Sequence, residues 1–174
     1  MIKIAQHLIV ALLILLTAGC STQRGLSSQW KDKQIEMNVA GLVNKPPYQN
    51  ALRVSVIAYN GEVLLAGQTN DTSLKRQFID DVRAMSDVER VYDQLRIGSL
   101  ADINSVSRDT WITGRLKTAL LADSSINNGT IKLMTEAQEV FLMGTLPKTQ
   151  ISLATNKARE IDGVKEVFTI IYPE

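Results

Sequence analysis

The pattern of apolar and polar positions occurs twice along the chain. Glu62-Val-Leu-Leu-Ala-Gly67 returns as Glu139-Val-Phe-Leu-Met-Gly144, 77 positions later. Apolar positions on either side of this segment match at offsets of 77 and 76, whereas those of the preceding helix match at 81, which pairs Trp30 with Trp111. Offsets that drift slowly over several elements indicate a duplicated unit with changes in loop length.

Each copy predicts the order helix, strand, strand, helix, strand. In the first copy Ile35, Val39 and Leu42 have helical spacing, and residues 52–58 alternate as a half-buried strand does. Asn60-Gly61 then predicts a two-residue hairpin turn. In the second copy the same pieces are expected over residues 110–122, 130–135, 139–143, 148–161 and 164–172.

The order of elements predicts an α+β fold built from two tandem αββαβ units, over residues 29–97 and 109–174. A hairpin followed by a strand–helix–strand crossover gives a three-stranded mixed sheet with two helices on one face. Units this small have marginal cores, so we expect them to pack on each other across a linker over residues 98–108. The second hairpin has Ala137-Gln138 in place of Asn-Gly, so a different type of turn is expected there.

The N-terminus has the basic, apolar and small-residue zones of a secretory signal. Lys3 precedes the unbroken apolar run Leu8 to Leu16, and Ala18-Gly19 leads to Cys20. The run is too short for a permanent membrane span. A cysteine directly after small residues is typical of a bacterial lipobox, although Thr17 stands where that motif usually has Leu. We therefore expect a signal over residues 1–19, acylation of Cys20 and a linker over residues 20–28; the alternative is an ordinary cleaved signal with a chance cysteine.

Charge and rare residues exclude several classes of function. The chain has 19 Lys and Arg against 18 Asp and Glu, so its overall charge gives no argument for nucleic-acid binding. The only histidine, His7, lies in the signal, and Cys20 is the only cysteine. The mature chain therefore lacks the residues for a histidine-based triad, a free cysteine nucleophile or a zinc site built on His or Cys. We expect no enzyme, no cofactor and no metal.

The first helix of the second copy carries a second, partly apolar face. At 100° per residue, Trp111, Gly114, Thr118 and Leu121 lie well away from the core stripe, and no acidic residue occurs over residues 110–122. Tryptophan favours the membrane interface, and basic residues near a surface attract anionic headgroups. The candidate contacts for anionic phospholipid are Trp111, Arg115, Lys117, Thr118 and Leu121.

Two alternatives remain for this face. Trp111 and Leu121 could pack against the other unit, as Trp30 at the matching place suggests. The same face could instead bind another envelope protein. In the first copy Lys31 and Lys33 interleave with acidic residues, so that helix is the weaker candidate for lipid contact.

The duplicated unit resembles the BON domain, in which a V-x-L-x-G run closes the second strand; Val63 to Gly67 and Val140 to Gly144 have this form. Together with the lipobox, the two copies resemble BON-domain outer-membrane lipoproteins of Gram-negative bacteria. The resemblance implies a periplasmic, lipid-anchored protein that binds phospholipid through the first helix of the second BON unit and supports envelope integrity. A periplasmic adaptor for another protein is the alternative function.

Overall fold

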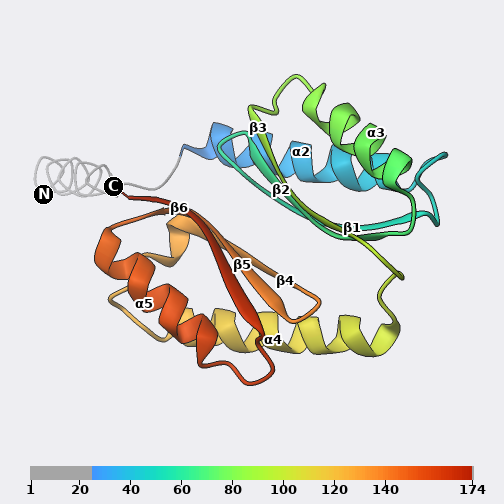
Figure 1. Cartoon of the computed structure of the whole chain (residues 1–174). Helices are drawn as coiled ribbons and strands as arrows, with labels where there is room; N and C mark the ends of the chain where they lie inside the picture. Colours follow the sequence, from blue (N-terminus) through green and yellow to red (C-terminus); the bar gives the residue numbers. More distant parts are fainter. Residues whose placement is uncertain (1–24, 174) are drawn as a thin grey trace, which may run out of the picture.

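The computed structural model describes residues 25–173, which form two αββαβ units in tandem (Figure 1). The signal over residues 1–19 and Cys20 lie outside these residues. The first unit contains α2 (Leu26–Val43), β1 (Leu52–Tyr59), β2 (Glu62–Thr69), α3 (Thr72–Arg83) and β3 (Arg90–Ile97). The second contains α4 (Ile103–Leu121), the 3-10 turn η1 (Asn128–Thr130), β4 (Ile131–Glu136), β5 (Glu139–Leu146), α5 (Lys148–Arg159) and β6 (Glu166–Pro173). Among the helices of the described part, none is long and apolar enough to cross a bilayer.

Both units have the same sheet topology, which confirms the expected α+β fold. In the first, β1 pairs antiparallel with β2, and β2 pairs parallel with β3. The second repeats this with β4, β5 and β6. Two helices cover one face of each sheet and bury its apolar side chains, among them Val39, Leu65 and Phe78 in the first unit, and Leu116 and Leu142 in the second.

The glycine that closes the V-x-L-x-G run allows the central strand to approach its antiparallel neighbour. A Cβ atom on Gly67 would lie 2.0 Å from the carbonyl oxygen of Arg53, and one on Gly144 would lie 2.1 Å from that of Thr130. Both distances are far inside van der Waals contact, and the atom met is backbone. The motif glycine is therefore a steric requirement of the hairpin in both units.

Both hairpin turns have positive φ at both central residues, so the expectation of a different second turn was wrong. Asn60 and Gly61 have φ of 51° and 78°, and Ala137 and Gln138 have φ of 53° and 68°. Asp109 on α4 explains how residues other than Asn and Gly adopt positive φ there. Its carboxylate accepts hydrogen bonds from the backbone N–H groups of Ala137 at 2.9 Å and Gln138 at 2.7 Å.

The first unit has an equivalent buried aspartate, and it corrects the alignment of the helices. Asp32 on α2 accepts a hydrogen bond from the backbone N–H of Gly61 at 3.0 Å. Asp32 and Asp109 are 77 positions apart, as are the buried pairs Ile35 with Ile112 and Val39 with Leu116. The offset of 81 deduced from the tryptophans was therefore wrong by one helical turn, and Trp30 and Trp111 are not equivalent.

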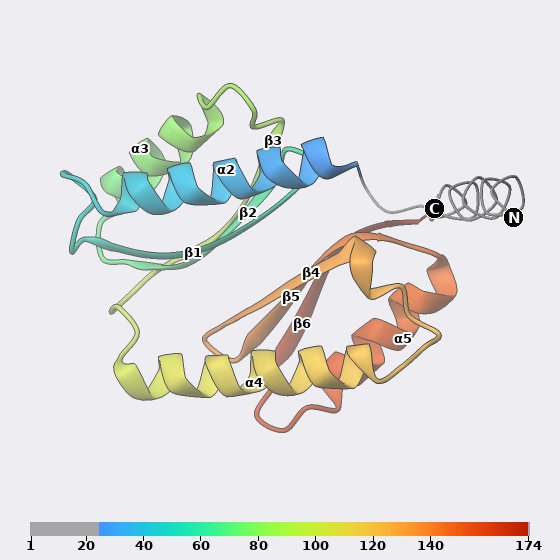
Figure 2. The same cartoon turned by 180° about the vertical axis from the view of Figure 1, so that it is seen from behind.

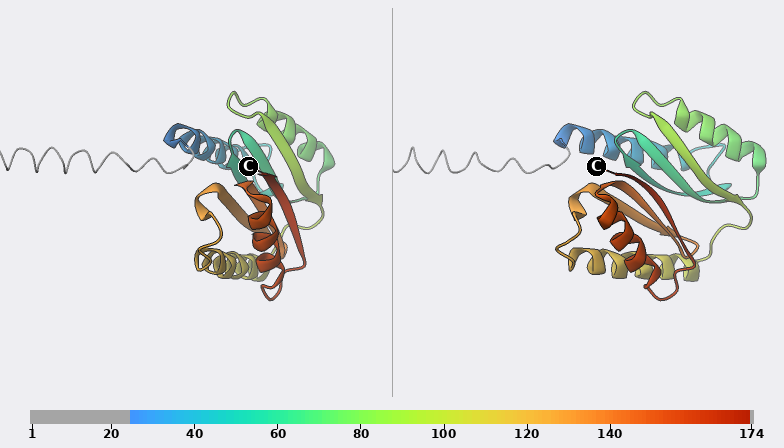
Figure 3. Two further views of the ribbon diagram at one scale, coloured as in Figure 1. Left: turned by 90° about the vertical axis from the view of Figure 1, so that its left-hand side faces the viewer. Right: turned by 60° about the vertical axis from the view of Figure 1, so that its left-hand side comes forward.

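The helix-free faces of the two sheets pack against each other, which confirms that the units pack together. Figures 1 and 2 show the resulting layers: α2 and α3, the first sheet, the second sheet, then α4 and α5. Figure 3 shows the same order from two further sides. The buried side chains between the sheets are Ile57, Tyr59, Leu64, Ala66, Met134, Phe141 and Met143.

Polar contacts at the edges of this apolar layer fix the two units relative to each other. Glu136 of β4 is buried and accepts hydrogen bonds from Ser55 Oγ at 2.8 Å and Gln68 Nε2 at 2.9 Å. Arg96 at the end of β3 lies 2.6 Å from Glu139 of β5. The connection is also shorter than the linker expected over residues 98–108, because α4 begins at Ile103 with Asp102 as its cap.

Candidate functional site

Helix α4 has a buried face toward its own sheet and a long exposed face. Ile112, Leu116 and Leu120 are buried in the core of the second unit. The large apolar side chains on the exposed side are Trp111, 49% exposed, and Leu121, 71% exposed. These two exposed side chains make the outer side of α4 the candidate binding surface.

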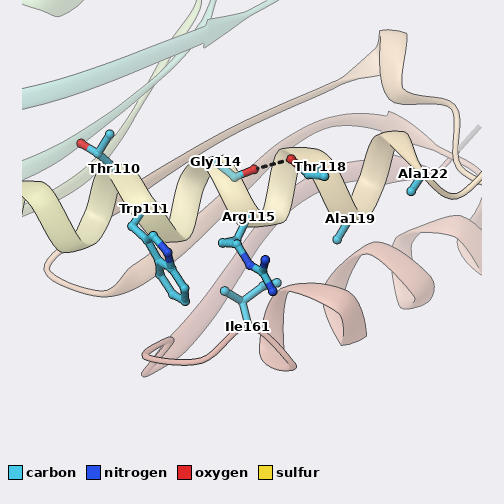
Figure 4. Close-up of a pocket in the computed structure, with 8 residues that line it drawn as sticks. All are labelled: Thr110, Trp111, Gly114, Arg115, Thr118, Ala119, Ala122 and Ile161. Atoms are coloured by element: carbon cyan, nitrogen blue, oxygen red, sulfur yellow. Dashed lines mark hydrogen bonds between the residues drawn. The ribbon is translucent and has the colours of Figure 1, made fainter.

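Three of the predicted lipid contacts line one shallow groove along α4. Trp111 and Arg115 point from α4 toward Ile161, which follows α5, and Thr118 lies further round the helix beside Gly114 (Figure 4). The full lining is Thr110, Trp111, Gly114, Arg115, Thr118, Ala119, Ala122 and Ile161. We call this surface the α4 groove. Ile161 was not among the predicted contacts, because it comes from the turn after α5 and carries no signal in the sequence that would link it to α4.

The side chains of the α4 groove leave it open, largely apolar and cationic at one place. The guanidinium carbon of Arg115 lies 5.8 Å from the centre of the Trp111 ring, which is cation–π distance. Thr118 donates its hydroxyl to the Gly114 carbonyl at 3.0 Å, so its polar atom is already satisfied within the helix. A Cβ on Gly114 would meet open space, so packing does not require this mid-helix glycine. Because Gly114 has no side chain, the helix backbone is exposed at this point of the groove.

The other two predicted contacts lie on a different flank of α4. Lys117 and Leu121 line a second groove together with Glu36 of α2 and Lys132 of β4. The Glu36 and Lys132 side chains form an ion pair at 2.8 Å between the units. The structure therefore divides the predicted set: Trp111, Arg115 and Thr118 share the α4 groove, whereas Lys117 and Leu121 face the junction with the first unit.

No acidic residue lines the α4 groove itself, although exposed Asp162 shares an adjoining hollow with Trp111 and Arg108. Asp109, the acidic residue within α4, is buried and bonded to the hairpin turn. Beyond the end of the helix, Asp123 lies 3.0 Å from Lys157 of α5. The pKa of Asp123 is lowered to about 2, mainly by a hydrogen bond from Ser125 and next by Lys157. Asp123 thus stays ionised and pairs with Lys157. Arg115 is then the basic residue in the lining of the α4 groove.

Every residue that lines the α4 groove belongs to the second unit. The alternative in which Trp111 seals the contact between the units therefore has no support in its surroundings, because α4 lies in an outer layer (Figure 2). Leu121 lies closer to the junction, in the groove that includes Ile57 of the first unit, but it remains mostly exposed.

Comparison with known proteins places the chain in a family. The profile of the BON domain matches residues 31–99 and again residues 108–169. The chain is 34% identical over 149 residues to the 21 kDa hemolysin of Actinobacillus pleuropneumoniae, covering 85% of this chain and 77% of that protein. It is 30% identical over 148 residues to the outer membrane lipoprotein DolP of Haemophilus influenzae, covering 84% and 77%.

Among solved structures, the C-terminal domain of CdsD from the type III secretion system of Chlamydia trachomatis is similar at 12% identity and a TM-score of 0.35, over 79% of this chain and 96% of that one. Two family matches that together span most of the described residues agree with the duplicated αββαβ architecture. The chain belongs to the BON-domain family, as a protein of two tandem BON domains that is similar to the DolP outer-membrane lipoprotein.

Proposed function

We propose that this protein is a periplasmic lipoprotein, anchored in the outer membrane through acylated Cys20, which binds anionic phospholipid through the α4 groove. The observation that carries the proposal is the half-exposed Trp111 with Arg115 against its ring, on a helix face without an exposed acid. The proposed location follows from the N-terminal sequence and from the similarity to an outer membrane lipoprotein.

The α4 groove suits a bilayer surface better than a soluble small molecule. It is shallow and open rather than enclosed, so it would not surround a ligand as a typical small-molecule pocket does. Tryptophan is amphipathic and prefers the depth of lipid headgroups. Each basic residue near an anionic membrane contributes roughly 1 kcal/mol of attraction, which salt screens. Arg115 beside Trp111 combines both contributions at one place.

Charge reversal within α4 tests whether the groove is the contact. Arg115→Glu removes one attraction and adds one repulsion, so we expect binding to anionic vesicles to weaken by about 2 kcal/mol, roughly 30-fold. Lys117→Glu makes the same change of charge on the same helix but outside the groove, and we expect a much smaller effect. The measurement is vesicle flotation of the chain that begins at Ser21, which holds all described residues, with and without added salt.

Equal losses of vesicle binding in the two variants would show that binding depends only on net charge. The α4 groove would then not be a specific contact. If neither variant loses binding, the α4 groove is not the lipid contact; if wild-type protein does not float with anionic vesicles, phospholipid is not the ligand. Co-purification of one stoichiometric envelope protein that Trp111→Ala releases would then favour the adaptor function. Both variants lie on exposed positions, so their unfolding transitions should match that of the wild type.

A further inference from the structure

Helix α2 carries a second exposed apolar stripe, on the face opposite its core. Leu26 is 76% exposed, Trp30 73% and Met37 63%. At 100° per residue these positions fall within about 40° of one another, and Lys33 lies about 20° to one side of them. The buried residues Ile35 and Val39 occupy the other side of the helix. We call Leu26, Trp30, Lys33 and Met37 the α2 stripe.

The acidic residues of α2 do not lie on this stripe, contrary to what their interleaving with lysines suggested. Asp32 is fully buried and bonded to the hairpin turn. The Glu36 carboxylate accepts hydrogen bonds from the backbone N–H of Ala58 at 3.1 Å and from Lys132 at 2.8 Å. Lys33 reaches the same carboxylate at 3.4 Å yet stays exposed, and Lys31 is exposed as well. The outward face of α2 is therefore apolar and cationic.

The length of chain before α2 indicates what covers the stripe. Cys20 and Leu26 are six residues apart, and an extended chain reaches at most about 3.5 Å per residue, so the start of α2 stays within ~20 Å of an acyl-anchored Cys20. We infer that the α2 stripe rests on the bilayer in which Cys20 is anchored. This inference depends on the proposed acylation of Cys20, but not on lipid binding by the α4 groove.

The α2 stripe and the α4 groove face away from each other. Glu36 of α2 and Lys117 of α4 line the same groove between the units, so these flanks of the two helices are turned toward one another. The stripe lies opposite the buried Ile35 and Val39, the α4 groove lies away from the buried Leu116, and the two helices belong to opposite outer layers (Figure 3). A flat bilayer can therefore contact one of these faces at a time, and the short linker favours the α2 stripe for the anchoring membrane.

Depth-dependent quenching in the acylated full-length protein tests this inference. The mature protein, with its acyl chains verified by mass, is reconstituted into phosphatidylethanolamine and phosphatidylglycerol vesicles with or without brominated acyl chains. The variant Trp111→Phe leaves Trp30 as the reporter, and Trp30→Phe leaves Trp111. We expect bromine to quench Trp30 strongly in the anchored protein and Trp111 much less. As a matched control, Asn38→Trp in a background without Trp30 and Trp111 reports an exposed α2 position off the stripe and should stay unquenched.

The outcomes separate this inference from the proposed function. Equal Trp30 emission with plain and brominated lipid would overturn the inference. The same holds if the Asn38→Trp reporter is quenched as much as Trp30, because the contact would then not be specific to the stripe. Trp30 emission that shifts to shorter wavelength with protein concentration in detergent, without lipid, would show a second copy on the stripe and would also overturn it. Failure of the Ser21 chain to bind vesicles, with Trp30 quenched in the anchored protein, would refute only the α4 proposal.

Discussion

Replacement of Gly144 by alanine is expected to unfold the second BON domain under mild conditions. The added Cβ would lie 2.1 Å from the Thr130 carbonyl oxygen and 3.0 Å from the Ile131 Cα, and no side-chain rotation can relieve a clash with backbone. The hairpin must separate or bend, so we expect a loss of at least about 3 kcal/mol in the free energy of unfolding. Urea unfolding followed by circular dichroism measures it.

Gly114→Ala is the control for this change, because it adds the same methyl group where a Cβ meets open space. In the interior of a helix alanine is favoured over glycine by about 1 kcal/mol, so this variant should be at least as stable as the wild type. A Gly144→Ala protein with a wild-type urea midpoint would show that the strands of this hairpin are not in close approach.

Loss of the buried carboxylate in Asp109→Ala is expected to cost nearly as much. Two backbone N–H groups of the second hairpin turn lose a charged acceptor, and hydrogen bonds of this kind contribute about 1.5–3 kcal/mol each. Ala137 and Gln138 have positive φ, which is strained for residues other than glycine. Without the aspartate, nothing offsets this strain in the turn. We expect a total loss of about 3 kcal/mol in the free energy of unfolding.

Asp32→Ala provides the comparison in the first domain. Its turn is Asn60-Gly61, a pair that adopts positive φ readily, so the loss there should be smaller, about 1–2 kcal/mol. Gln138→Gly in the Asp109→Ala background should recover about 1 kcal/mol, because glycine removes the left-handed strain at one position. Equal losses in the two domains, together with no recovery, would contradict the assigned role of Asp109.

Periodicity was sufficient to predict the fold, because each element has one dominant pattern. The helical spacing of Ile35 and Val39, the alternation in β1 and the repeated V-x-L-x-G run predicted two αββαβ units that pack together. Local turn preference failed at Ala137-Gln138, because an aspartate 28 residues earlier stabilises that turn. Such a contact between distant parts of the chain leaves no signal in the turn itself.

The site was predictable only in part, for a related reason. An angular plot of α4 identified an exposed face with Trp111 and Arg115, but it treated the whole outward side as one surface. The neighbours of α4 divide that side, since Ile161 completes the groove on one flank and Glu36 lies across the other. Likewise, the acidic residues Asp32 and Glu36 made α2 the weaker predicted lipid contact. In the fold both carboxylates point inward and accept backbone hydrogen bonds.

The emission of Trp111 on vesicles tests the central claim most directly. In the Trp30→Phe form of the chain that begins at Ser21, Trp111 is the only tryptophan and is 49% exposed in the absence of lipid. If the α4 groove enters the headgroup region, its emission shifts to shorter wavelength when anionic vesicles are added, and high salt reverses the shift. Emission that stays unchanged while the protein floats with the vesicles would show that it binds lipid through another surface, and would contradict the account.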